Sequence, residues 1–165
     1  MSENVEQFDL VLDRVVPLSA SQLWEGWTNP TMLMQWFCPL PYLTVECDID
    51  LRPGGGFRTV MQSPEGERFD NSGCYLAIEE GSRLVWTSAL GPDYRPNPLT
   101  APTEGAPPSF HFTCELTFTE TPDGTRYLAR GIHASKADRD VHEQMGFAEG
   151  WGAALDQLVA LYAKS

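Results

Sequence analysis

The residues of this chain best suited to acid–base chemistry are His133, His142, Glu143 and Glu115. An imidazole beside a carboxylate in a dry cavity could transfer protons, as a cyclase or dehydratase does. Counted at about 100° per residue, His142 falls about 120° from the centre of the apolar stripe on the last predicted helix, so we expect it at the rim or in solvent. Glu115 falls on the polar side of a predicted strand. His133 is therefore the one catalytic candidate.

His133 shares a face of its predicted strand with Ala129 and Gly131, whose small size could leave room for a ligand. The alternative interpretation is a hydrogen-bonded histidine at a strand end, without chemistry. Metal binding has little support, because the histidines at 111, 133 and 142 show no HxH or HExxH spacing and no cysteine sits beside one. We therefore predict no metal site and no cofactor.

Two other kinds of chemistry also lack their sequence context. The run Gly54-Gly55-Gly56 connects two predicted strands, and no helix follows it to supply an anion-binding N-terminus. Ser72 and Ser109 lack the strand–turn–helix setting of a hydrolase nucleophile. Phosphate binding and serine hydrolase activity are both disfavoured.

A second set of residues could line an apolar pocket. Its members come from the N-terminal helices, the strands and the last helix, and each could instead be plain core: Trp36, Phe57, Tyr75, Trp86, Phe112, Phe118, His133, Met145 and Trp151. Together they would form an apolar pocket with few polar groups, the usual form of a small-molecule site. Arg58, Arg95 and Arg130 could offer a charge to a ligand carboxylate, or could simply be solvated.

The composition narrows the choice of partner. The formal net charge of −12 disfavours nucleic acid and anionic membrane, both of which need clustered Lys and Arg, so a neutral or apolar small molecule fits best. No apolar run approaches the roughly 20 residues that span a bilayer, and Met1–Glu6 does not resemble a signal peptide. The cysteines at 38, 47, 74 and 114 form no CxxC pair, which predicts free thiols in a cytoplasmic protein.

The elements that must position these residues follow from the apolar spacing, and residues 1–165 are expected to form one domain. Alternation predicts strands at about 8–16, 42–50, 55–62, 67–79, 83–90, 110–119 and 124–134. Two short helices, at 20–27 and from Pro30, are predicted between the first two strands, with Ser19 and Asn29 as N-caps. Because one side of each strand is polar, the sheet should be antiparallel and covered on one face.

The C-terminal part returns to a helical period over about 137–162. Its apolar stripe comprises Val141, Met145, Ala148, Gly152, Leu155, Val159 and Tyr162. Gly146, Gly150 and Gly152 each cost roughly 1 kcal/mol in a helix, so we expect either close backbone approach or room for a ligand to offset them. The Pro-rich segment 91–109 is too long for a simple turn and is either a lid over the interior or a passive insertion.

Four local motifs, in order, resemble those of the SRPBCC (START-like) superfamily, in the branch of activator of heat shock protein 90 ATPase homologues. They are Trp24-Glu25-Gly26-Trp27-Thr28-Asn29-Pro30 with Leu33 and Trp36, Asp50-Leu51-Arg52-Pro53-Gly54-Gly55-Gly56-Phe57, Asn71-Ser72-Gly73-Cys74-Tyr75-Leu76, and the His142–Trp151 stretch that ends in Gly150-Trp151. The resemblance implies an α+β helix-grip fold, in which a curved antiparallel sheet of about seven strands surrounds a long C-terminal helix.

The resemblance also implies a cavity between sheet and helix that binds hydrophobic molecules. Our first hypothesis is therefore a binding protein for a hydrophobic or amphipathic small molecule. A cyclase-, dehydratase- or hydrolase-like enzyme acting in that cavity is the alternative. A chaperone-linked protein-interaction domain is the third hypothesis, and a homodimer could use the same exposed surface.

Overall fold

The structure of the chain is a computed structural model that describes residues 8–99 and 109–163. Its elements in chain order are β1 (Asp9–Val16), α1 (Ala20–Thr28), α2 (Pro30–Leu33), β2 (Leu43–Ile49), β3 (Gly56–Gln62), β4 (Arg68–Glu79), β5 (Arg83–Thr87), the short 3-10 helix η2 (Pro92–Tyr94), β6 (Phe112–Thr121), β7 (Gly124–His133), α3 (Lys136–Gln144) and α4 (Phe147–Ala163). The predicted strands and N-terminal helices are all present, although β5 ends at Thr87, earlier than expected.

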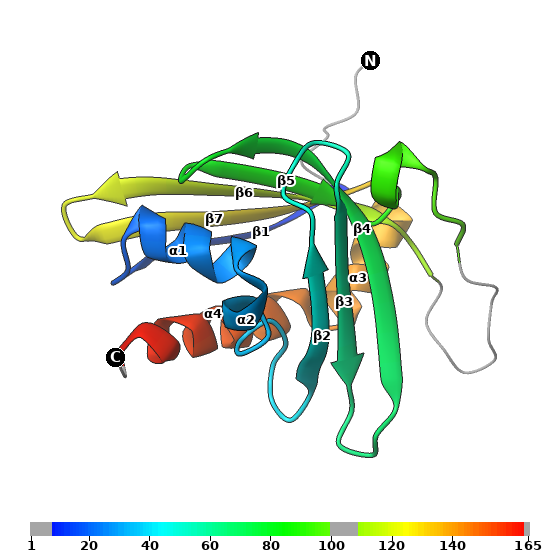
Figure 1. Ribbon diagram of the computed structural model, residues 1–165, viewed down its shortest axis with the longest axis horizontal. Helices are drawn as coiled ribbons and strands as arrows, with labels where there is room; N and C mark the ends of the chain where they lie inside the picture. Colours follow the sequence, from blue (N-terminus) through cyan, green and yellow to red (C-terminus); the bar gives the residue numbers. More distant parts are fainter. Residues whose placement is uncertain (1–7, 100–108, 164–165) are drawn as a thin grey trace.

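The strands form one antiparallel sheet in the order β1-β7-β6-β5-β4-β3-β2. The first strand pairs with the last, since Asp9 lies opposite Ile132 and Val16 opposite Thr125. Figure 1 shows the sheet curving strongly, with β6, β7 and β1 crossing above α4 and with β2, β3 and β4 beside it. The predicted helix-grip architecture is confirmed.

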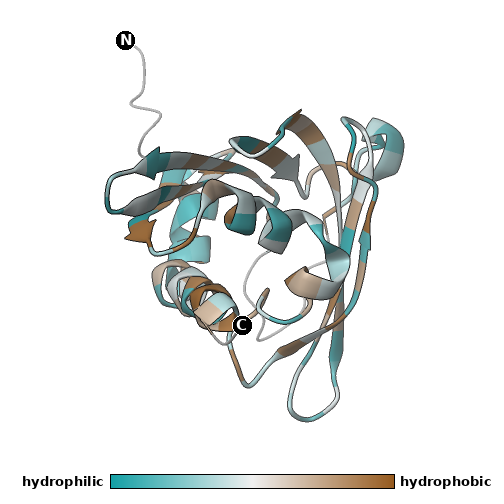
Figure 2. Ribbon diagram, turned by 60° about the vertical axis from the view of Figure 1, so that its left-hand side comes forward, coloured by the Kyte–Doolittle hydropathy of each residue, from teal (hydrophilic) through white to brown (hydrophobic). Residues whose placement is uncertain are grey.

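The two short helices begin where their caps predict. Ser19 caps α1 with a capping box, because its hydroxyl accepts from the Gln22 N–H and the Gln22 side chain accepts from the Ser19 N–H. The Asn29 side chain accepts from the Thr31 and Met32 N–H groups at the start of α2. Figure 2 shows both helices lying with α4 inside the curve of the sheet. The face of the sheet turned toward these helices is called the inner face below.

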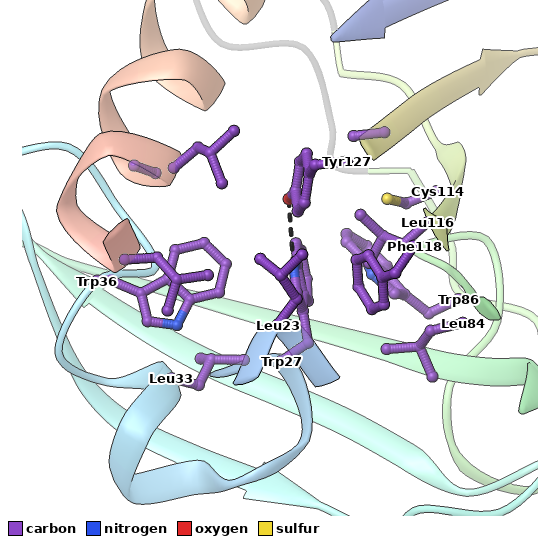
Figure 3. Close-up of a cluster of buried hydrophobic side chains, with 14 of the residues drawn as sticks. Leu23, Trp27, Leu33, Trp36, Leu84, Trp86, Cys114, Leu116, Phe118 and Tyr127 are labelled. Carbon is purple, nitrogen blue, oxygen red and sulfur yellow. Dashed lines mark hydrogen bonds between the residues drawn. The ribbon is translucent and has the colours of Figure 1, made fainter. Parts of the chain in front are cut away.

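The N-terminal tryptophans fill one end of the interior. Trp27 is 1% exposed, and its Nε1 donates to Tyr127 Oη on β7 at 3.1 Å. The Trp36 ring meets the Trp27 ring edge-on, with centroids 5.1 Å apart. Figure 3 shows these rings among Leu23, Leu33, Leu84, Leu116 and Phe118. The end of the interior nearest α1 is therefore packed with side chains.

The C-terminal helix differs from the prediction, because it is broken. α3 ends at Gln144 and α4 starts at Phe147, with Gly146 between them at φ 94°. This left-handed conformation is accessible to glycine and strained for other residues, so it interrupts the helical phase. As a result Met145 is 59% exposed and Ala148 is exposed, although both belonged to the predicted apolar stripe.

The described part of the candidate lid packs on the outer face of the sheet. Asp93 N–H donates to the Gly54 carbonyl at 2.7 Å, and a Cβ on Gly56 would approach Pro92 to 2.9 Å. Successive residues of a strand face opposite sides of the sheet. Because the buried Phe57 side chain points into the interior, a Cβ on Gly56 would point to the outer face. Residues 91–99 therefore do not cover the interior, and residues 100–108 lie outside the described residues.

Candidate functional site

Two buried polar groups on neighbouring strands define the candidate site. The register pairs Tyr75 of β4 with Trp86 of β5, so their side chains project from the same face. Tyr75 is 0% and Trp86 is 7% exposed. Among the residues that the structure describes, neither Tyr75 Oη nor Trp86 Nε1 has a hydrogen-bond partner. Burial of such a group without a partner costs about 1–3 kcal/mol, so the pair needs an explanation.

The surroundings of this pair are aromatic. Phe57 stacks on Tyr75 with ring centroids 5.4 Å apart and meets Trp86 edge-on at 5.1 Å. On the other side, Phe112 of β6 lies 5.5 Å from Trp86. Burial raises the pKa of the Tyr75 phenol, which therefore stays protonated. The site offers an indole donor and a phenol, which can donate or accept, among apolar rings.

A histidine pair lies at the next position along this row of rings. His133 of β7 and His142 of α3 join through His133 Nε2 and His142 Nδ1, which are 2.9 Å apart. His133 Nδ1 lies 2.8 Å from the carbonyl oxygen of Phe8. Phe112 contacts both imidazoles, with centroids 5.9 Å from His133 and 4.7 Å from His142. The pair thus shares the inner face with Tyr75 and Trp86.

The placement of His142 is a correction to the sequence analysis. It is 9% exposed rather than at the rim or in solvent. The prediction extended one helical phase through 137–162, and Gly146 breaks that phase, so the position of His142 in α3 cannot be counted from the residues of α4. Burial and the neighbouring His133 lower the pKa of His142 to about 4, which keeps its ring neutral at pH 7.

His133 lies on the inner face, and both of its ring nitrogens already have protein partners. One nitrogen contacts the Phe8 carbonyl and the other contacts His142. The room expected above Gly131 is occupied, since a Cβ there would lie 3.4 Å from the Phe147 ring. His133 therefore contacts His142 through Nε2 and the Phe8 carbonyl through Nδ1, and its catalytic role stays a prediction.

The remaining predicted pocket residues divide into three groups. Trp36 and Phe118 are core, because Trp36 Nε1 donates to the Gly26 carbonyl at 2.9 Å and Phe118 stacks on Tyr127 at 5.8 Å. Trp151 of α4 is half-buried and lies 6.2 Å from Phe112, so it borders the site. Met145 is exposed and lies outside it.

The charged candidates form ion pairs or are exposed, and the three on strands, Arg58, Arg130 and Glu115, lie on the outer face of the sheet. Arg58 binds Asp70 at 2.9 Å and Asp48 at 3.1 Å. Arg130 binds Asp9 at 2.7 Å, and Glu115, which alternation placed on the polar side, binds Arg83 at 2.8 Å. Arg95 is exposed, and Glu143 is exposed and pairs with Arg139 at 3.0 Å. These ion pairs leave no charge aimed at the interior from this set of residues.

The described part of the chain offers little room or chemistry for other sites. A crevice beside Trp36, Cys38 and Gln157 holds about 20 Å³, room for about one water molecule and too little for a ligand. Residues 8–99 and 109–163 contain no group of three or more His, Cys, Asp or Glu side chains placed to hold a metal ion. No helix within these ranges is both long and apolar enough to cross a membrane.

The seven-stranded antiparallel sheet wrapped around a long C-terminal helix defines a helix-grip protein of the START-like class. Residues 17–163 match the sequence model of the activator of Hsp90 ATPase homolog 1-like proteins. The chain belongs to this family.

Solved structures agree with this assignment. A crystal structure of a protein from Nitrosomonas europaea is 42% identical, with a TM-score of 0.85 and 96% of each chain covered. A protein from Mycobacterium smegmatis is 26% identical, with a TM-score of 0.74 and coverage of 97% of this chain and 93% of that one. A Silicibacter pomeroyi protein named for the same family is 22% identical, with a TM-score of 0.66, 94% of this chain covered and 97% of that one, a likeness of fold. No curated protein matches the chain.

The sequence predicts Tyr75 and Trp86 as apolar lining, and no sequence pattern marks their polar atoms as unpartnered. Strand alternation could place both on one face, but only the register shows that they lie opposite each other. The His133–His142 contact was missed for a different reason. Its only signal was Gly146, which marks the end of α3.

Proposed function

We propose that the chain binds a small, uncharged and largely apolar molecule in its interior, between the inner face of β4–β6 and the C-terminal helices. The observation that carries this proposal is the adjacent pair of buried polar atoms without partners, Tyr75 Oη and Trp86 Nε1. A bound molecule that accepts from the indole and hydrogen-bonds the phenol would offset the cost of burying them.

Charge and packing narrow the proposal. The formal net charge of −12 disfavours an anion, and the neutral ring of His142 supplies no counter-ion. Trp27 and Trp36 fill the interior beside α1, and Trp27 lies 6.4 Å from the Trp86 ring, so we place the ligand on the side of Trp86 that Phe112 borders. The family fold, with its association with ligand binding, supports the same choice.

The enzyme alternative is weaker on the same geometry. Both nitrogens of His133 are occupied, so it has no atom free for a substrate proton. His142, with a pKa of about 4, is a weak base, whereas an efficient general base titrates near the working pH. Hydrogen bonding to a ligand, rather than proton abstraction, is what this pair can do well.

The protein-interaction alternative has one supporting observation. An exposed apolar group lies around the start of the edge strand β2 and comprises Leu40, Tyr42, Leu43 and Phe69, with 68, 41, 53 and 40% exposure. The Tyr42 and Phe69 rings lie 6.3 Å apart. A chaperone-linked contact or a homodimer would use this group, and both remain predictions.

A cytoplasmic location also remains a prediction, and the four free cysteines support it.

The ligand is sought by native mass spectrometry of protein purified gently from its host. We expect a retained molecule with no net charge, and its loss when Tyr75 and Trp86 are both replaced by Phe. The matched control is Tyr127→Phe, which removes a phenol oxygen that already has a protein partner. A molecule retained equally by all three proteins, or none retained by the wild type at any gentle desolvation energy, would contradict the proposal.

A further inference from the structure

The neighbours of the His133–His142 pair determine which ring donates the hydrogen bond between them. A backbone carbonyl can only accept, so the short contact between His133 Nδ1 and the Phe8 oxygen requires the proton on Nδ1. In a neutral imidazole the other nitrogen then accepts, which places His133 Nε2 as the acceptor. His142 Nδ1 must therefore carry the proton of the contact between the two rings.

This series of hydrogen bonds leaves the lone pair of one ring nitrogen, His142 Nε2, without a partner from the pair. With its proton on Nδ1, neutral His142 has an unprotonated Nε2. No hydrogen bond between described residues reaches that atom, and it is not one of their fully buried unpartnered atoms, which are Tyr75 Oη and Trp86 Nε1, so it stays accessible to a bound molecule. The carbonyl of Phe8 thus determines, through two rings, that His142 presents an acceptor rather than a donor.

The surroundings keep this acceptor neutral. His142 is 91% buried and lies among the rings of Phe110, Phe112 and Phe147, with centroids 5.0, 4.7 and 5.1 Å away. No carboxylate of the described residues hydrogen-bonds to either imidazole, so nothing favours the charged form. A neutral acceptor among aromatic rings recognises a donor on an apolar molecule and does not attract an anion.

We propose that Nε2 of His142 accepts a hydrogen bond from a hydroxyl group of the bound molecule, so that the ligand is an uncharged aromatic molecule carrying a hydroxyl, a phenol in the chemical sense. This inference rests on the proposed function and adds the recognition group. Phe112 connects the two halves of the site, because it contacts Trp86 at 5.5 Å and His142 at 4.7 Å. The indole N–H of Trp86 then meets an acceptor elsewhere on the same molecule.

The test compares phenol with its methyl ether, anisole, by titration of the full-length protein with NMR detection. Anisole is the more apolar of the two, so burial favours anisole, whereas a hydrogen bond from the hydroxyl favours phenol. We expect wild-type protein to bind phenol roughly five- to tenfold more tightly than anisole. We also expect phenol to shift the ¹⁵N resonance of His142 Nε2, with both rings keeping their Nδ1–H tautomers.

The decisive variant is His142→Asn. The amide of Asn can still donate to His133 Nε2, as Nδ1 of histidine does, but it has no atom at the Nε2 position. We expect this variant to keep its anisole affinity within about twofold and to lose the preference for phenol. His142→Phe, which also removes the contact with His133, is the comparison for effects of folding alone.

Each result supports or overturns the inference. Equal affinity for phenol and anisole in the wild type would overturn it while the proposed function stood. Binding of neither probe would overturn the proposed function and the inference with it. A spectrum in which His142 carries its proton on Nε2 would overturn the inference even if the variants failed to fold.

Discussion

Trp27 and Tyr127 join the first helix to the last strand across the core, with Trp27 Nε1 3.1 Å from Tyr127 Oη and both residues 1% exposed. Tyr75, equally buried, has no such partner. The interior therefore contains two buried phenols, and they differ in whether the phenol oxygen has a hydrogen-bond partner. Tyr127 has a protein partner, and Tyr75 has none among the described residues.

We predict that Tyr127→Phe lowers the free energy of unfolding by about 1–2 kcal/mol, because it leaves the Trp27 N–H buried without a partner. Tyr75→Phe should change stability by less than about 0.5 kcal/mol or raise it, because no protein hydrogen bond is lost. Urea unfolding of the ligand-free proteins measures both. Equal losses in the two variants would show that Tyr75 has a partner in the protein.

Much of the fold could be predicted because its signals are local. Ser19 and Asn29 cap helices through hydrogen bonds to residues two or three positions away, so sequence spacing is enough to place them. The alternation of apolar and polar residues predicts the strands, and the family motifs predict how the strands are arranged in the fold. The described elements agree with these expectations to within a few residues.

The site was harder to predict because it depends on long-range register and on one backbone angle. His133 and Phe8 are 125 residues apart and meet only because β1 pairs with β7. The three glycines near the C-terminus could each mean a break, a close approach or open space. Gly146 is a break at φ 94°, whereas a Cβ on Gly152 would lie 2.5 Å from Arg14 Nη2. Composition does not distinguish these cases.

The break at Gly146 can be tested directly. Gly146→Ala should lower the free energy of unfolding by about 1–2 kcal/mol, because an L residue is strained at this positive φ. Gly146→Asn should lose less, since Asn tolerates left-handed backbone better than Ala. Denaturant midpoints measure the difference. If Ala proved stabilising, α3 and α4 would form one continuous helix in solution.

A second glycine tests the contact between α1 and α4. A Cβ on Gly26 would lie 2.7 Å from Leu158 Cδ1, and Leu158 is fully buried, so its side chain cannot move into solvent. We expect Gly26→Ala to cost about 1–2 kcal/mol, because the steric clash outweighs the gain in helix propensity.

The matched control for that substitution is Gly150→Ala. Gly150 also lies in a helix, but the nearest atom to its added Cβ is Pro39 Cγ at 4.0 Å. Here only the propensity gain remains, and we expect about 0.5–1 kcal/mol of stabilisation. Thermal unfolding of the two variants side by side measures the contrast. The same sign of change in both would mean that α1 and α4 do not approach this closely.

The last prediction concerns pH and follows from the burial of His142. Its pKa is lowered from 6.5 to about 4 in the folded protein, chiefly by burial. The unfolded chain therefore binds this proton more readily, so the contribution is fully present above pH 6.5 and is lost as pH falls toward 4. We expect a loss of about 1–3 kcal/mol in unfolding free energy between pH 7 and pH 4 from this group.

Carboxylates also titrate over this range, so the measurement is the difference between wild type and His142→Asn. The variant, without an imidazole at this position, should show the shallower dependence of urea midpoint on pH. Parallel profiles would mean that His142 is as exposed in the folded protein as in the unfolded chain, which would remove the neutral acceptor that the proposed ligand site requires.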